Sequence, residues 1–162
     1  MSRLESIEAC RTAGFAGFET VQALRASRLA PVPDRPGVYV ILFDGRSVPP
    51  FVTPSPAGHF KGRNPTVEEP ILHQAWVDGA CIVYIGKASG SLRTRLRAYL
   101  AHGAGRAAAH WGGRFIWQIE PSHKLLVAWR EETEESARKT ERALIEAFID
   151  QYGRRPFANR VR

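Results

Sequence analysis

The sequence predicts a single α/β domain in which short β-strands and amphipathic helices follow one another along the chain. The chain has 162 residues, of which 44% are hydrophobic, and this suits one soluble domain with a sizeable core. Two runs that are rich in β-branched and aromatic residues have the composition of strands. Two longer segments repeat apolar residues at the three- and four-residue spacing of a helix face.

Residues 1–35 are expected to form an N-terminal helical extension without chemistry of its own. The sequence Ser2-Arg3-Leu4-Glu5 matches a capping box, in which side chains satisfy free backbone N–H groups, and it predicts the start of a helix. A second short helix is predicted from Thr20 to Leu29, where two prolines follow. Residues 36–162 are expected to form the main domain.

The first strand is predicted over residues 37–44, GVYVILFD. Proline and glycine crowd the residues that follow, which indicates a loop with a short edge strand at 51–53. Thr66-Val67-Glu68-Glu69 matches a second capping box and predicts a short helix toward Trp76. Residues 81–86, CIVYIG, predict a short buried strand.

Ser91 is expected to cap the next helix, which ends at Gly103 and has a core face formed by Leu92, Leu96, Tyr99 and Leu100. Residues 114–119 and 124–129 predict two strands that form a hairpin. The longest helix is predicted over 131–152. Its first turn is acidic, as the helix dipole favours, and Gly153 suits its C-terminal end.

Positive charge is concentrated in one long segment of a chain whose net charge is +7. Residues 79–119 contain no Asp or Glu, but they hold Lys87, Arg93, Arg95, Arg97, Arg106 and Arg114. The C-terminal residues add Arg154, Arg155, Arg160 and Arg162, again without an acid. A segment this long with positive charges and no negative ones favours a phosphate-binding face over a surface that merely contacts solvent.

Several classes of protein are excluded by what the sequence lacks. No apolar run approaches the roughly 20 residues that span a bilayer, and the first residues lack the pattern of a secretion signal. Cys10 and Cys81 form no CxxC pair and are expected to be free thiols in a reducing cytoplasm. The residues around Gly86-Lys87-Ala88 do not match the phosphate loop of nucleotide hydrolases. We therefore expect a cytoplasmic protein with no membrane partner.

Glu141 is the clearest anomaly in the sequence, because it lies within the apolar stripe of the longest helix. Ala137 and Ile145 stand four residues to either side of it. A carboxylate on a buried face is unfavourable unless it is paired or binds a metal. Two interpretations stay open: an ion pair with an arginine such as Arg95 or Arg138, or ligation of Mg²⁺ or Mn²⁺.

Arg95 lies near the edge of the core face of its helix, one turn before Tyr99, which suits a clamp on a phosphate. Tyr39 and Tyr84 are either core aromatics or, near a cation or a metal-bound water, groups that transfer protons. Gly86 and Lys87 follow closely after Tyr84. The glycine allows close approach of the backbone, and the lysine adds a positive charge. His110, which precedes Trp111 and two glycines, is a secondary candidate.

The ordered set of motifs resembles the GIY-YIG nuclease superfamily. The resemblance runs through Pro36-Gly37-Val38-Tyr39, Tyr84-Ile85-Gly86-Lys87-Ala88, the segment LRTRLRAY at 92–99, Glu141-Arg142-Ala143-Leu144-Ile145 and Pro156-Phe157-Ala158-Asn159. Residues 84–99 are most similar to the nuclease module of bacterial excision repair. The motifs extend from Pro36 to the C-terminal residues, so residues 1–35 lie outside the resemblance.

The resemblance implies a small central, mostly antiparallel sheet flanked by helices, and metal-assisted hydrolysis of a nucleic-acid phosphodiester. It implies that Glu141 holds Mg²⁺ or Mn²⁺, that Arg95 grips the scissile phosphate, and that Tyr39 or Tyr84 activates the water. Further substrate-binding residues are then expected at Gly86, Lys87, Arg93, Arg97, Tyr99, His110, Arg114 and Asn159.

DNA is the expected substrate of such an enzyme. RNA is an alternative, because Trp111 and Trp117 offer rings on which bases stack. The alternative function is a nucleic-acid-binding module of the same fold without catalysis. The two tyrosine tripeptides lie further apart than is usual in the superfamily, so residues 45–80 are interpreted as an insertion that covers the cleft or binds a protein partner.

Overall fold

A four-stranded antiparallel sheet lies at the centre of the fold. The computed structural model describes residues 3–45, 47–107 and 110–160, and within them the strand order is β1-β4-β2-β3. β2 (Gly37–Leu42) pairs with both β3 (Ile82–Ala88) and β4 (Leu126–Glu131), and β1 (Ala16–Thr20) pairs with β4. The predicted fold class, an antiparallel sheet flanked by helices, is confirmed.

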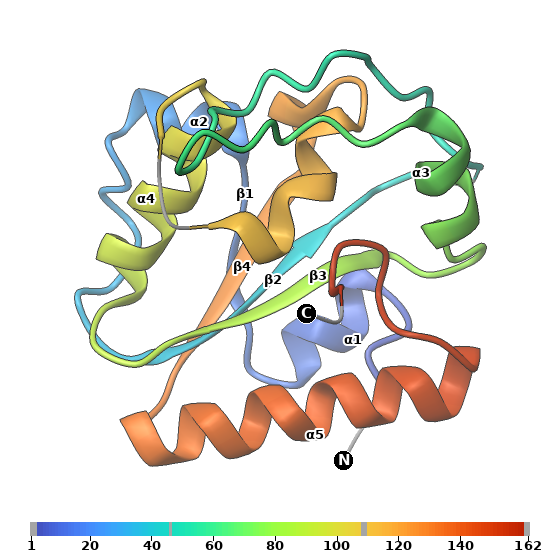
Figure 1. Cartoon of the computed structure of the whole chain (residues 1–162). Coiled ribbons are helices and arrows are strands. Elements are labelled where there is room, and N and C mark those ends of the chain that lie inside the picture. Colours follow the sequence, from blue (N-terminus) through green and yellow to red (C-terminus); the bar gives the residue numbers. More distant parts are fainter. Residues whose placement is uncertain (1–2, 46, 108–109, 161–162) are drawn as a thin grey trace.

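Helices cover both faces of this sheet (Figure 1). The α-helices are α1 (Ile7–Thr12), α2 (Val21–Ala26), α3 (Glu69–Ala75), α4 (Leu92–Gly103) and α5 (Glu134–Tyr152). Two 3₁₀ helices, η1 (Trp111–Gln118) and η2 (Ser122–Lys124), separate α4 from β4. α5 and α1 lie on one face, while α2, α4 and η1 lie on the other. No helix within the described residues is both long and apolar enough to cross a membrane.

Strand β2 is buried on both faces because it is central in the sheet. Val38, Val40 and Leu42 pack in the cluster beneath α5, and Tyr39 and Ile41 pack in the cluster beneath α4. This assignment follows the two-residue period of a strand, whose successive side chains point to opposite faces. Tyr39 is thereby fixed on the α4 face.

Regular strand pairing places Tyr84 on the same face as Tyr39, because Tyr84 pairs with Ile41, two residues after Tyr39, and a bulge in β3 begins just beyond this pair. The register shifts at the end of the β2–β3 pair, where Ile41 faces Tyr84 but Leu42 faces Ile82. The extra residue, Val83, belongs to the cluster beneath α4, and Tyr84 also packs against this cluster. A bulge of this kind redirects side chains locally, and here two consecutive residues contact one face.

Local capping signals account for two of the correctly predicted helices. Ser91 caps α4, its hydroxyl accepting a hydrogen bond from the backbone N–H of Thr94 at 3.1 Å. Gly153 ends α5 with φ of 76°, a left-handed conformation that glycine adopts without strain.

Two capping boxes were assigned to the wrong residues. α1 begins at Ile7 and is capped by Ser6, whose hydroxyl accepts from the N–H of Ala9, whereas Ser2 lies outside the described residues. α3 begins at Glu69, because the hydroxyl of Thr66 instead accepts from the backbone N–H of Ser55. In the second case the Thr66 hydroxyl, which the local pattern predicted to cap the helix, bonds the backbone across the loop instead.

The predicted hairpin at 114–119 and 124–129 is wrong. Most of its first half forms the 3₁₀ helix η1, and the edge strand expected at 51–53 is reduced to a single bridge between Phe51 and Ile119. Phe115 and Trp117 are buried beneath α4 rather than alternating across a sheet. β4 pairs with β2 and with β1, a strand that the sequence analysis missed between the two opening helices.

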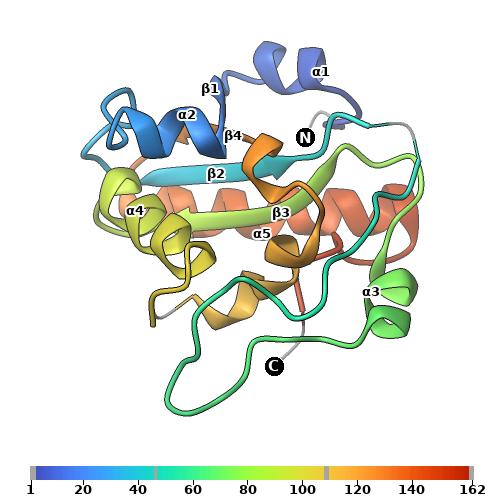
Figure 2. The same cartoon turned by 90° about the horizontal axis from the view of Figure 1, so that it is seen from above.

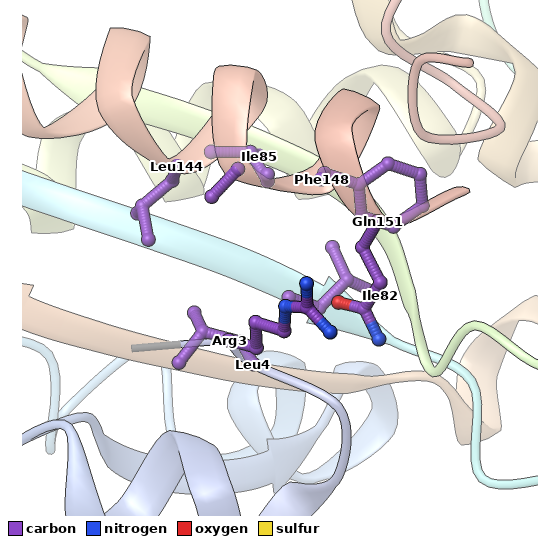
Figure 3. A pocket seen from close by; sticks show the side chains of 8 residues that line it. Arg3, Leu4, Ile82, Ile85, Leu144, Phe148 and Gln151 are labelled. Carbon is purple, nitrogen blue, oxygen red and sulfur yellow. The ribbon is translucent and has the colours of Figure 1, made fainter. Parts of the chain in front are cut away.

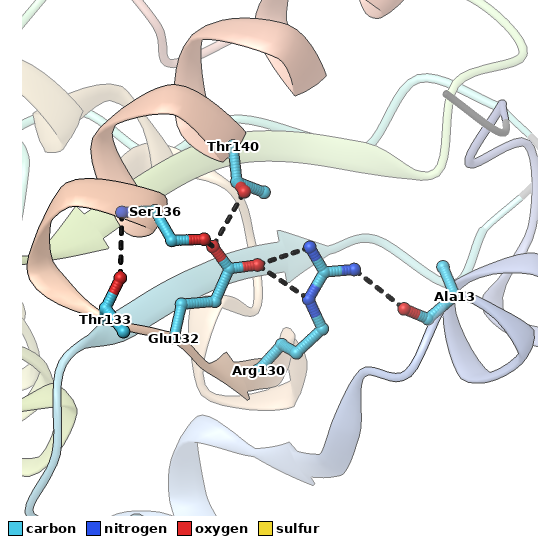
Figure 4. Close-up of polar contacts among 6 residues, drawn as sticks. All are labelled: Ala13, Arg130, Glu132, Thr133, Ser136 and Thr140. Atoms are coloured by element: carbon cyan, nitrogen blue, oxygen red, sulfur yellow. Dashed lines mark hydrogen bonds and ion pairs between the residues drawn. The ribbon is translucent and has the colours of Figure 1, made fainter.

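A polar network joins the start of α5 to the end of α1 (Figure 4). One carboxylate oxygen of Glu132 accepts hydrogen bonds from Arg130, and the other accepts from Ser136 at 2.8 Å and Thr140 at 2.7 Å. Arg130 also donates to the carbonyl of Ala13 at 2.8 Å. Burial raises the pKa of the Glu132 carboxyl, but the donors from Thr140, Arg130 and Ser136 outweigh it and hold this pKa below its ordinary value.

Glu132→Ala is expected to lower the free energy of unfolding by about 2–3 kcal/mol at neutral pH, because it leaves Arg130 without its partner in a site where Glu132 is only 8% exposed. A carboxyl whose pKa is lowered by folding stabilises the protein above its unfolded-state pKa, and this contribution is lost as the pH falls through the folded-state pKa. Urea unfolding at neutral and acid pH measures both effects. The exposed Glu131→Ala is the control, and equal losses in the two variants would contradict the prediction.

Candidate active site

A cleft at the outer edge of β3 is lined by side chains from the consecutive elements β3 and α4 and from α5, which follows much later in the sequence. Tyr84 and Lys87 come from β3, and Ser89 follows it. Arg95 comes from α4 and Glu141 from α5. Because α4 and α5 cover opposite faces of the sheet (Figure 1), only the edge strand β3 brings their side chains together.

Glu141 is half-buried in this cleft without a direct partner. It forms no hydrogen bond or ion pair within the described residues, so the pairing with Arg95 or Arg138 is not found there. Burial raises the pKa of its carboxyl, and the positive charges of Lys87 and Arg95 oppose part of this rise. A desolvated carboxylate that cations flank but do not neutralise is suited to a positively charged ligand.

The tyrosines have different surroundings, although their rings form one cluster. Tyr39 lies 6.1 Å from Tyr84 and 6.3 Å from Tyr99, measured between ring centroids. Tyr39 is fully buried, and burial raises the pKa of its phenol well above the ordinary value, so it stays protonated. The nearby guanidinium of Arg95 opposes this rise, but no hydrogen bond of normal geometry joins the two groups. Tyr84 is only partly buried and lines the cleft.

Tyr99 and His110 form a layer behind the cleft. The Tyr99 hydroxyl is buried and donates to the carbonyl of Gly113 at 2.6 Å, and its ring stacks on His110 at 4.7 Å. Burial, with smaller contributions from the charges of Arg95 and His102, lowers the pKa of His110 to about 3. His110 is therefore neutral at physiological pH. Tyr99, a predicted substrate-binding residue, lines neither the cleft nor its surroundings, and its hydroxyl is engaged inside the protein.

The glycines of the two tripeptides are explained by close packing. A Cβ atom on Gly86 would lie 2.4 Å from Cζ of Tyr39, its partner across the sheet. A Cβ atom on Gly37 would lie 2.2 Å from the carbonyl oxygen of Arg130. Both distances are far below van der Waals contact, so these glycines position Tyr39 and β2 and do not themselves line the cleft.

Gly86→Ala is expected to lower the free energy of unfolding by about 1–3 kcal/mol, because the ring of Tyr39 must move to admit the methyl group. Thermal unfolding measures this loss, and Gly90→Ala is the matched control because nothing lies within 4 Å of a Cβ at that position. A Gly86→Ala protein that unfolds at the wild-type temperature would show that Tyr39 is free to adjust.

Asn159 holds the edge of β3 in place. Its side-chain oxygen accepts from the backbone N–H of Ile85, and its side-chain nitrogen donates to the carbonyl of Ile85, both at 2.9 Å. The N–H of Ala158 donates to the carbonyl of Val83 at 2.8 Å. The C-terminal segment thus binds the backbone on both sides of Tyr84, which makes Asn159 a positioning residue.

The remaining predicted residues divide between structural positions and a second depression. Arg93 donates to the carbonyl of Val32 at 2.9 Å, and the exposed Arg97 lies outside the cleft. Arg114 and His110 instead line a groove that shares Tyr84 and Arg95 with the cleft. We call it the arginine groove, because its lining includes Arg63, Arg95, Arg114 and Arg160.

Sequence reasoning missed Ser89, Phe60 and Arg63 as lining residues. Phe60 and Arg63 lie within residues 45–80, where composition indicated only a loop, and no local signal distinguishes them. Arg160 could have been found from the sequence, because it belongs to the acid-free C-terminal residues that predict a phosphate-binding face.

A third depression lies on the α5 face of the sheet and is not a candidate site. Figure 3 shows Leu4 and Arg3 facing Leu144, Phe148 and Gln151 of α5 across it. Its volume is only about 10 Å³, and most of its lining is aliphatic or aromatic. It marks where the N-terminal residues pack against the core.

The metal-ligand set available in the cleft is small. Among residues 3–45, 47–107 and 110–160, no three His, Cys, Asp or Glu side chains gather closely enough to hold a metal ion. Within the part of the chain that the structure describes, Glu141 is the one acid that lines the cleft. This suits Mg²⁺, which keeps several waters and is commonly bound by one or two carboxylates together with substrate phosphates.

Comparisons with known proteins add no information on this site. No protein-family model, no curated protein and no solved structure matched the chain. The assignment of the cleft therefore rests on side-chain geometry and on the resemblance of the motifs.

Proposed function

We propose that the protein is a divalent-metal-dependent endonuclease of the GIY-YIG type, which hydrolyses phosphodiester bonds of nucleic acid, with DNA as the substrate. The observation that carries this proposal is the meeting of Tyr84, Arg95 and Glu141 in one cleft at the edge of β3. These three side chains supply a group for proton transfer, a phosphate clamp and a metal ligand.

Glu141 would hold the metal ion, Mg²⁺ or Mn²⁺, because its carboxylate is desolvated and has no direct partner among the described residues. When bound, such an ion supplies Lewis-acid stabilisation of negative charge on the phosphate. Burial raises the pKa of Glu141, and the charge of the nearby Lys87 offsets part of this rise, so it favours the ionised form that binds a cation.

Arg95 would bind the scissile phosphate. Its side chain is exposed at the cleft, and it forms no ion pair with an acid of the described chain. A guanidinium donates two parallel hydrogen bonds to phosphate oxygens and stabilises the charge that develops in the transition state.

Tyr84 is the better candidate of the two strand tyrosines for contact with the attacking water. It lines the cleft, whereas Tyr39 is fully buried and kept protonated by its surroundings. Tyr84 would orient the water and relay its proton, while Tyr39 would support Tyr84 through the packed rings.

A binding module without catalysis is the second candidate. The arginine groove favours it, because four arginines attract phosphates whether or not the cleft performs chemistry. The two functions differ only in what happens after binding.

Incubation of the purified protein with supercoiled plasmid tests the proposal. We expect nicked circles with Mg²⁺ or Mn²⁺ and intact plasmid with EDTA. Salt-sensitive binding without cleavage under either metal would support the binding module instead. A parallel assay on RNA of matched sequence decides between the two nucleic acids.

A further inference from the structure

The arginine groove concentrates positive charge without compensation. Arg63, Arg95, Arg114 and Arg160 line it, and no acid does so among the described residues. None of the four forms an ion pair within that part of the chain. Burial lowers the pKa of the Arg114 guanidinium, and the charges of Arg63 and Arg160 lower it further. The free protein therefore holds these cations together against their repulsion, and an anion in the groove would relieve it.

Aromatic rings pack against the cations of the groove. The guanidinium carbons of Arg63 and Arg114 lie 4.8 Å and 4.6 Å from the ring centroid of Trp111. The guanidinium carbon of Arg160 lies 5.2 Å from the centroid of Phe115, a core residue that supports Arg160 from beneath the groove. Phe60 adds a ring at the groove wall. A lining that combines planar rings with guanidinium groups suits a ligand that carries both planar bases and phosphates.

One wall of the groove is a small hairpin of the inserted segment. Phe60 and Arg63 exchange backbone hydrogen bonds of 3.1 Å and 2.9 Å. Between them Lys61 and Gly62 have φ of 51° and 75°, the left-handed conformations of a tight hairpin turn. This turn aims Arg63 and Phe60 into the groove that also holds Arg95.

Figure 2 shows the path of the inserted segment from the end of β2 to α3, and hydrogen bonds anchor it to the rest of the domain. Gly58 donates its N–H to the carbonyl of His102 at 2.9 Å, and its own carbonyl bonds the His102 ring at 2.8 Å. The side chain of Gln118 accepts from the N–H of Val67 and donates to the carbonyls of Val52 and Val67. Hydrogen bonds therefore hold the segment on both sides of the hairpin, and its wall of the groove is preformed.

We propose that the arginine groove binds an unpaired strand of nucleic acid that continues from the phosphate held by Arg95. The groove shares Arg95 and Tyr84 with the cleft, so one strand can occupy both. Rings that contact base faces require bases that are not stacked in a duplex. This inference rests on the proposed nuclease function for the orientation of the strand, and it makes a junction beside single-stranded nucleic acid the preferred substrate.

Binding of a fluorescent oligothymidylate of about 20 nucleotides to the full chain in EDTA tests the groove separately from cleavage. Arg63→Gln, at an exposed turn position, is expected to weaken binding about fivefold and to reduce the slope of log Kd against log salt by about 0.7. Arg114→Gln is expected to act similarly, and the double variant to lose about twice the slope. Lys139→Gln removes one charge from the exposed side of α5 and is the matched control.

Each result decides for or against the groove. Reduced slopes for both arginine variants, with Lys139→Gln unchanged, support it. Unchanged slopes, or a blunt duplex that binds more tightly than the oligothymidylate, overturn it even if the plasmid is cut. If the variants lose binding but the wild-type protein never cuts with Mg²⁺ or Mn²⁺, the result supports strand binding by the arginine groove and contradicts the nuclease proposal.

Discussion

Glu141→Gln is expected to reduce the rate of Mg²⁺-dependent plasmid nicking by roughly 10²–10³-fold. The amide has nearly the shape of the carboxylate but no negative charge, so it no longer attracts a divalent cation. The wild-type side chain forms no direct polar contact within the described residues, so the substitution breaks none there. The loss is therefore expected in the chemistry rather than in the fold.

The stability of the same variant distinguishes a functional carboxylate from a structural one. Burial raises the pKa of Glu141, and a raised carboxyl pKa means that stability is lost as the pH rises through the folded-state value. At neutral pH the wild-type protein therefore carries a penalty that Gln removes. Glu141→Gln is expected to unfold at the wild-type temperature or slightly above it.

Single-turnover nicking and thermal unfolding, measured side by side, test both expectations. Glu146→Gln is the control, because Glu146 is exposed on the same helix. Undiminished cutting by Glu141→Gln would refute the metal assignment. A lowered unfolding temperature would show instead that the carboxylate stabilises the fold.

Arg95→Ala is expected to slow cleavage by roughly 10²-fold or more, and Arg95→Lys is expected to restore only a small part of the rate. Lysine keeps the charge but loses the planar fork that binds two phosphate oxygens at once. The exposed position of Arg95 means that neither variant should alter the unfolding temperature by much.

Cleavage at saturating DNA, with binding measured separately in EDTA, shows where the loss occurs. We expect a large change in the cleavage rate and a modest change in affinity. Arg97→Ala, on the same helix but outside the cleft, should weaken general attraction only. Equal losses of rate in Arg95→Ala and Arg97→Ala would argue against a specific clamp.

Much of the cleft could be predicted from the sequence, because its residues carry local anomalies. Glu141 interrupts an apolar stripe, and Arg95 lies at the edge of a helix face in a segment without acids. Both irregularities are visible without knowledge of the fold. The structure places these two side chains with Tyr84 at one strand edge.

The arginine groove could not be predicted in the same way. Arg63 lies in a short hairpin within residues 47–68, and the bonds of Gly58 to α4 and of Gln118 to Val67 hold this segment where Arg63 meets Trp111. Contacts between residues so distant in sequence leave no periodic signal. The sequence analysis missed strand β1 for the same reason, because β1 is held by pairing with β4, which lies more than 100 residues later in the chain.

The sequence by itself determined the elements that nearest-neighbour chemistry controls. Ser91 and Gly153 delimit helices through groups within one turn, and the continuous run of β-branched and aromatic residues in β2 predicts a strand whatever surrounds it. The tertiary structure decided which tyrosine meets solvent. Tyr39 and Tyr84 follow similar patterns, but β2 is central in the sheet and buries Tyr39, whereas β3 is the outer strand and leaves Tyr84 partly exposed. Strand order and register depend on packing of the whole sheet, which no local segment encodes.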